Sequence, residues 1–115
     1  MLPGFPNTAP LTIDEERLAR IIASGLLKRV GKNRSITSSE IIEKMNKAFG
    51  CNLAGSTLRK IIHHIRVNNL VPWLIATASG YYVAESEKEL LDYIYSLRGR
   101  ENAIKEVREC LERQL

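Results

Sequence analysis

The segment from Ser56 to Asn69 constrains the fold more than any other part of the sequence. Its apolar residues recur at steps of three and four, which places them on one side of an α-helix. These residues are Leu58, Ile61, Ile62, Ile65 and Leu70. The opposite side is polar and basic and carries Ser56, Arg59, Lys60, His63 and Arg66. The pattern predicts a helix with one side in the core and a basic side facing outward.

Acidic residues are missing around this predicted helix. Residues 44–84 contain five Lys/Arg and no Asp/Glu, a formal charge of +5. Residues 1–43 contain six Lys/Arg and five Asp/Glu, a formal charge of +1. Residues 85–115 contain six Lys/Arg and eight Asp/Glu, a formal charge of −2. We therefore expect the cations of the helix to lack acidic partners nearby. A localised positive surface attracts polyanions, although a solvated basic face gives the same pattern.

The remaining composition describes a soluble domain. A chain of 115 residues with 44% hydrophobic and 26% charged residues suits one compact core. The two cysteines form no CxxC motif, and the first ten residues contain no secretory apolar run. No segment is apolar over the roughly 18 residues that a membrane span needs. These features predict a cytoplasmic protein that does not enter a membrane.

The amino-terminal third predicts an arm followed by a helix. Three prolines interrupt the first ten residues, so we expect residues 1–11 to form an extended arm. Thr12 and Glu15 fit a capping box, in which each side chain binds the backbone amide of the other residue. A helix is expected over about residues 13–29, with Val30 as a further core candidate.

A second capping box, Thr37 with Glu40, predicts a helix over residues 38–49. Its core side consists of Ile41, Ile42, Met45 and Phe49. Gly50 is expected to end it in the left-handed conformation. Leu53 should then fill the space between this helix and the basic one.

A β-hairpin is expected after the basic helix. Pro72 stops helical structure, and residues 73–77 and 81–84 are β-prone runs on either side of a short turn. The turn, Ala78 to Gly80, requires Gly80 at positive φ. Ser35 and Ile36 could add a third strand.

The order helix, strand, helix, helix, strand, strand is that of a winged helix. Residues 36–84 resemble the winged helix-turn-helix superfamily. The stretch STLRKIIHHIRVNNLVPWLIATASGYYVA, followed by a charged helix, is similar to small phage and prophage proteins assigned a DNA-binding winged helix. The resemblance implies a mainly α (α+β) winged-helix domain over residues 12–85 that places its recognition helix in the major groove. The chain departs from the pattern at the wing tip, which lacks Lys and Arg.

Residues 86–115 predict a helical extension. Ser86 and Glu89 fit a third capping box, and Leu90, Leu97, Ile104 and Leu111 repeat every seven residues. Glu101 and Arg108 interrupt this stripe, and Gly99 predicts a break or kink. Two roles remain open: a homodimer formed through this helix, or a helix folded onto its own domain.

The candidate DNA-binding residues lie on the two central helices. They are Lys44, Lys47, Ser56, Thr57, Arg59, Lys60, His63 and Arg66. Four or five of their cations would neutralise as many phosphates, which gives a salt slope near −4. Arg59 is the best candidate for reading a base, because a guanidinium can bind guanine O6 and N7 together. Contact with a phosphate is equally compatible with its position.

Other chemistry has less support. His63 and His64 are neighbours on a helix, so their side chains diverge by about 100° and do not chelate one ion easily. We expect one of them to face solvent or DNA and the other to border the core. Motifs for catalysis or phosphate cradling are absent, so we expect no enzyme activity and no cofactor.

The sequence thus favours a non-catalytic protein that binds double-stranded DNA, as a phage- or prophage-derived transcription regulator or a replication accessory. The main alternative is a protein-interaction module on a winged-helix scaffold, because this fold hosts both uses. A weaker alternative is an RNA or single-strand binder that stacks bases on Trp73, Tyr81 or Tyr82. Since Tyr81 and Tyr82 alternate along a strand, we expect at least one of them in the core.

Overall fold

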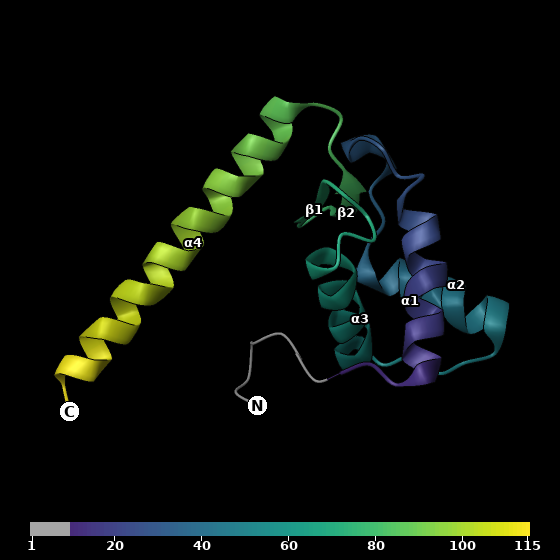
Figure 1. The fold of residues 1–115 in the computed structure, drawn as a ribbon, viewed down its shortest axis with the longest axis horizontal. Coiled ribbons are helices and arrows are strands. Elements are labelled where there is room, and N and C mark those ends of the chain that lie inside the picture. Colours follow the sequence, from purple (N-terminus) through teal and green to yellow (C-terminus); the bar gives the residue numbers. More distant parts are fainter. Residues whose placement is uncertain (1–9) are drawn as a thin grey trace. The chain divides into compact units, whose positions relative to one another are not determined.

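The computed structural model describes residues 10–115, so the predicted arm lies almost wholly outside the described residues. The chain divides into two compact units, Met1–Ala84 and Glu85–Leu115. Figure 1 shows three helices and a hairpin in the first unit and a single long helix in the second. Each unit is described by itself.

The elements, in chain order, are α1 (Ile13–Leu26), the 3-10 turn η1 (Lys32–Arg34), α2 (Ser38–Phe49), α3 (Gly55–Val67), β1 (Leu74–Thr77), β2 (Gly80–Val83) and α4 (Glu87–Arg113). The fold is mainly α, with a two-stranded antiparallel hairpin after the third helix and a long C-terminal helix. This order is compatible with a winged-helix arrangement. The first helix ends three residues earlier than expected.

The helix boundaries follow from local capping. The Thr12 hydroxyl accepts a bond from the Glu15 amide at 3.2 Å, and the Glu15 carboxylate accepts one from the Thr12 amide at 2.9 Å. Thr37 and Glu40 form the same reciprocal pair at the start of α2. Gly50 ends α2 with φ +62°. Two of the three predicted capping boxes and the left-handed glycine are thus confirmed.

The core of the first unit is built around α3. Four apolar residues of its inner side are buried: Leu58, Ile61, Ile62 and Ile65. They pack in one cluster with buried residues of the other two helices and of the hairpin, among them Ala19, Ile22, Leu26, Ile41, Met45 and Leu74. Leu53 is also buried in this cluster, as predicted. The amphipathic pattern of α3 therefore sets the centre of the fold.

Three residues assigned to the core are instead exposed. Leu70 is 38% exposed because α3 ends at Val67 and Asn69 turns the chain at φ +55°. Phe49 is 55% exposed because it is the last residue of α2. Val30 is 44% exposed because it lies beyond α1, where it forms a backbone bridge to β2. Helical spacing is informative only within the helix that produces it.

The hairpin pairs Leu74 with Val83 and Thr77 with Gly80, which leaves a two-residue turn. Gly80 has φ +119°, as the tight turn requires. The expected third strand is reduced to one bridge, in which Ile36 and Tyr81 exchange two backbone hydrogen bonds of 2.8 and 3.0 Å. Tyr82 is buried and Tyr81 is half-buried, which confirms that at least one tyrosine belongs to the core.

The second unit is one continuous helix, α4, of 27 residues. It passes through Gly99, so the predicted break is wrong: one exposed glycine does not outweigh the good helix formers around it. Ser86 caps its start, but the Glu89 carboxylate accepts from the amide of Glu85 at 2.9 Å, one residue beyond the expected partner. None of the residues of α4 is buried. Within residues 10–115, no helix combines the length and apolar character of a membrane span.

Candidate nucleic-acid interface

The outer side of α3 is polar and free of acidic residues. Ser56 and Arg59 are exposed, whereas Thr57, His63 and Arg66 are half-buried. Arg59 makes no ion pair or hydrogen bond with the described part of the chain. The residue before the helix is Ala54, so no side chain caps the first turn. This turn therefore presents backbone amides and a guanidinium without a local anion.

Lys60 differs from Arg59. Its ammonium nitrogen lies 2.7 Å from a carboxylate oxygen of Glu15, and the two side chains are only 12% and 17% exposed. The expectation that these cations lack acidic partners is therefore wrong for Lys60. Its partner comes from α1, 45 residues earlier in the chain, because the first turn of α1 packs beside α3.

The ion pair changes the acidity of Glu15. The hydrogen bond from Lys60, followed by the bond from the Thr12 amide, holds the pKa of Glu15 below its ordinary value. The pKa of Glu40 is lowered as well, chiefly by the backbone amide of Thr37. Both carboxylates are thus stabilised in their charged form by the groups that position the helix ends.

These shifts predict a loss of stability in acid. A carboxylate whose pKa is lower in the folded state stabilises the fold above its unfolded pKa, about 4.3 for Glu, and this contribution disappears as the pH falls through the folded pKa. We expect the urea concentration at the unfolding midpoint to decrease once the pH is lowered below about 4.3. In Glu15→Gln the midpoint should be lower at pH 7, and its difference from the parent should shrink by pH 3. A constant difference across this range would contradict the assignment.

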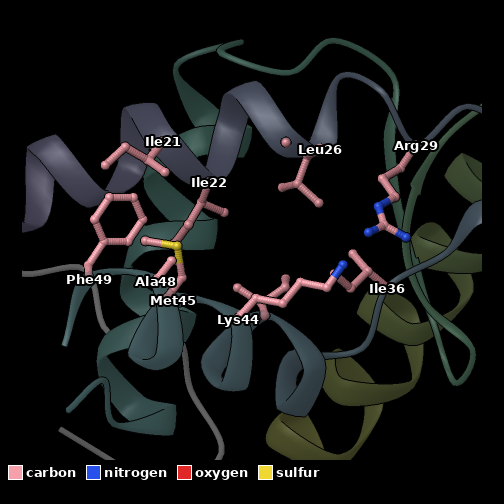
Figure 2. Close-up of a pocket in the computed structure, with 11 residues that line it drawn as sticks. Ile21, Ile22, Leu26, Arg29, Ile36, Lys44, Met45, Ala48 and Phe49 are labelled. Carbon is pink, nitrogen blue, oxygen red and sulfur yellow. The ribbon is translucent and has the colours of Figure 1, made fainter. Parts of the chain in front are cut away.

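Lys44, a candidate cation of α2, lines a groove to which Lys60 does not contribute. Lys44 lines an apolar groove of about 290 Å³ between α1 and α2, to which α3 contributes no residue (Figure 2). Arg29 lies at the same end of this groove, and Phe49 lies at the other end. Lys47 is exposed on α2. The described structure therefore groups Lys44 with Arg29 and does not place it with Arg59.

Arg29 is a cation beside this groove that is not among the DNA-binding candidates predicted from the sequence. It follows α1, and its guanidinium donates to the Arg34 carbonyl at 3.3 Å. The expected helix over residues 13–29 would place Ile22, Leu26 and Arg29 on one side, although α1 ends at Leu26. That spacing could have placed the cation beside the groove, but it carries no information about which helix forms the opposite wall.

The remaining candidates have structural surroundings. The Nδ1 atom of His64 lies 3.2 Å from the side-chain nitrogen of Asn68. Both His63 and His64 are half-buried. Among residues 10–115, no three His, Cys, Asp or Glu side chains come close enough to hold a metal ion. The thiol of Cys51 contacts the side chain of Asn46, which also accepts from the Leu53 amide at 2.9 Å. Cys51 thus belongs to the connection between α2 and α3.

The aromatic candidates do not share one surface. Trp73 is 45% exposed, whereas Tyr82 is 5% exposed and belongs to the core. The Tyr81 hydroxyl lies 3.3 Å from the Ser38 hydroxyl at the start of α2. A row of bases stacked on all three rings is therefore not supported by this geometry.

Comparisons of the chain with protein-family models, curated proteins and solved structures find no match. The compatibility with a winged-helix arrangement accordingly rests on the order of the elements. Since one fold can host several functions, the function has to be argued from the surface of α3 and the charge around it.

Proposed function

We propose that this protein binds double-stranded DNA without catalysis through the outer side of α3. Its role would be that of a cytoplasmic, phage- or prophage-derived winged-helix regulator or replication accessory. The observation that carries the proposal is Arg59, exposed near the start of α3 and without an acidic partner among the described residues. The first turn of α3 supports it, because uncapped amides at a helix start attract phosphate groups.

The distribution of charge also supports this proposal. Residues 1–84 contain eleven Lys/Arg and five Asp/Glu, a formal charge of +6, while residues 85–115 have a charge of −2. Three of the five acids are already engaged: Asp14 by Arg17, Glu15 by Lys60 and Glu40 by Thr37. The positive field therefore belongs to the unit that contains α3, and it would attract a polyanion to that unit.

The ion pair between Lys60 and Glu15 reduces the number of α3 residues that we expect to contact DNA. Base reading falls to Ser56, Thr57 and Arg59 in the first turns of α3, and His63 lies one turn beyond Arg59. With Lys60 neutralised by Glu15, fewer cations of α3 reach phosphates. We expect a salt slope of about −2 to −3, shallower than a count of all candidate cations gives.

The test is a titration of the full chain into mixed-sequence duplex DNA at about 50 and 200 mM salt, followed by fluorescence anisotropy. Arg59→Ala should weaken binding about tenfold, the lower end of what loss of a bidentate base contact produces. Arg20→Ala is the matched control, because Arg20 is exposed on α1 and the substitution changes the net charge equally. It should change the affinity less than twofold.

Two results would reject the proposal. One is no detectable duplex binding by the parent protein at about 50 mM salt. The other is an equal loss of duplex affinity in Arg59→Ala and Arg20→Ala, which would show that only the change in net charge matters. A single-stranded competitor of the same length should displace the duplex poorly. Strong displacement would favour the single-strand alternative.

A further inference from the structure

The helix α4 carries an apolar stripe that no other residue of the helix covers. Its positions alternate at spacings of four and three, as in a coiled coil. They are Leu90, Ile94, Leu97, Glu101, Ile104, Arg108, Leu111 and Leu115. Ile94 and Leu97 are 38% and 39% exposed, and Ile104 and Leu111 are 62% and 57% exposed. Six of the eight positions are thus apolar. Leu90 is half-buried and the other five are exposed, with Leu115 just beyond the last residue of α4.

The rest of α4 is mostly charged and polar, although Leu91, Tyr95 and Val107 are also exposed. Three ion pairs join residues four apart: Lys88 with Asp92, Lys105 with Glu109, and Arg108 with Glu112. Such pairs support a helix only weakly, and most helical stability in proteins comes from packing an apolar face. No residue of this 27-residue helix is buried, so its stripe is available to a partner.

The two charges within the stripe select that partner. Glu101 and Arg108 have opposite signs and stand at equal distances from the point between Ile104 and Lys105. In a parallel pair of α4 helices, each charge would face its own copy, which is unfavourable. In an antiparallel pair whose stripes pack on each other, Glu101 of each copy lies within about one helical turn of Arg108 of the other.

We propose that α4 pairs with the α4 helix of a second copy of this chain in an antiparallel coiled coil, in which Glu101 and Arg108 form two symmetric ion pairs across the interface. Arg108 is able to make this contact. Its side chain is 56% exposed, and its present partners, Glu109 and Glu112, lie on the same helix surface.

The pairing goes beyond the proposed function and does not depend on DNA binding. It would join two copies of the unit that carries α3. A twofold dimer of a DNA-binding domain recognises two half-sites, which raises the affinity of a single weakly binding domain. The dimer would form equally if α3 had another ligand.

The first test measures self-association of the full chain by sedimentation equilibrium. We expect a dimer for the parent, a dissociation constant raised at least tenfold in Glu101→Arg and in Arg108→Glu, and recovery to within about threefold in the double variant. Glu106→Arg is the matched control, since it makes the same charge change on the exposed side of α4 and should not alter the dimer. Circular dichroism confirms that every variant is folded.

The second test measures orientation. Lys88 is exposed near the start of α4, so a spin label is placed on Lys88→Cys after Cys51→Ser and Cys110→Ser. At a rise of 1.5 Å per residue, the antiparallel pair separates the two labels by about 50 Å, whereas a parallel pair brings them within about 20 Å. A short distance overturns the proposal, as does a monomeric parent or a double variant that fails to recover.

Discussion

Replacing Gly80 with alanine is expected to destabilise the first unit by about 3 kcal/mol or more. Gly80 has φ +119°, a conformation that side chains rarely adopt, and its added Cβ would collide with the backbone of Ile36 and Thr37. The backbone cannot move away at low cost, because Ile36 and Tyr81 hold each other through two hydrogen bonds. Relief of the collision would break the bridge that joins the hairpin to the start of α2.

The matched control for this substitution is Gly25→Ala. Gly25 lies in α1 of the same unit, and nothing stands within 4 Å of its added Cβ. Because alanine is the better helix former, we expect it to stabilise the unit by up to about 1 kcal/mol. Urea unfolding followed by the fluorescence of Trp73 reports on this unit alone. Equal midpoints for Gly80→Ala and the parent would show that the turn tolerates a side chain.

The sequence predicts those parts of the fold that short-range patterns decide. The apolar residues on the inner side of α3 recur within one helix, and the capping boxes at Thr12 and Thr37 each join two residues three positions apart. Both predictions are confirmed, because the interactions that decide these features lie within a few residues of one another. Phe49 and Gly99 show the limits of such rules, because the first depends on where a helix ends and the second on the strength of the residues around it.

The candidate site was predicted less completely, because its electrostatics depends on tertiary packing. The absence of acids from residues 44–84 says nothing about an acid on a neighbouring helix, and Glu15 reaches Lys60 from α1. The same reasoning applies to Lys44, which shares its groove with Arg29. Arg59 retains the surroundings expected from the sequence: it is exposed and has no acidic partner among residues 10–115.

Removing Lys60 should cost the first unit about 2 kcal/mol. In Lys60→Met the apolar stem is retained, but a largely buried Glu15 carboxylate loses its cation. Glu15→Leu should cost slightly more, because it also removes the acceptor for the Thr12 amide. The double variant should recover part of the loss, since an apolar pair can replace a buried ion pair. Urea unfolding of the four proteins gives the coupling between the two residues, expected at about 1 to 2 kcal/mol.

The same variants separate the structural role of Lys60 from binding. If Lys60 serves chiefly to hold α1 against α3, the Glu15→Leu, Lys60→Met double variant should keep the duplex affinity of the parent to within about threefold. The folded fraction is first confirmed by circular dichroism. Arg59→Ala provides the contrast, because its exposed side chain should change DNA affinity and leave the urea midpoint unmoved. A large loss of affinity in the folded double variant would instead assign Lys60 to the binding surface and show that DNA competes with Glu15 for its ammonium group.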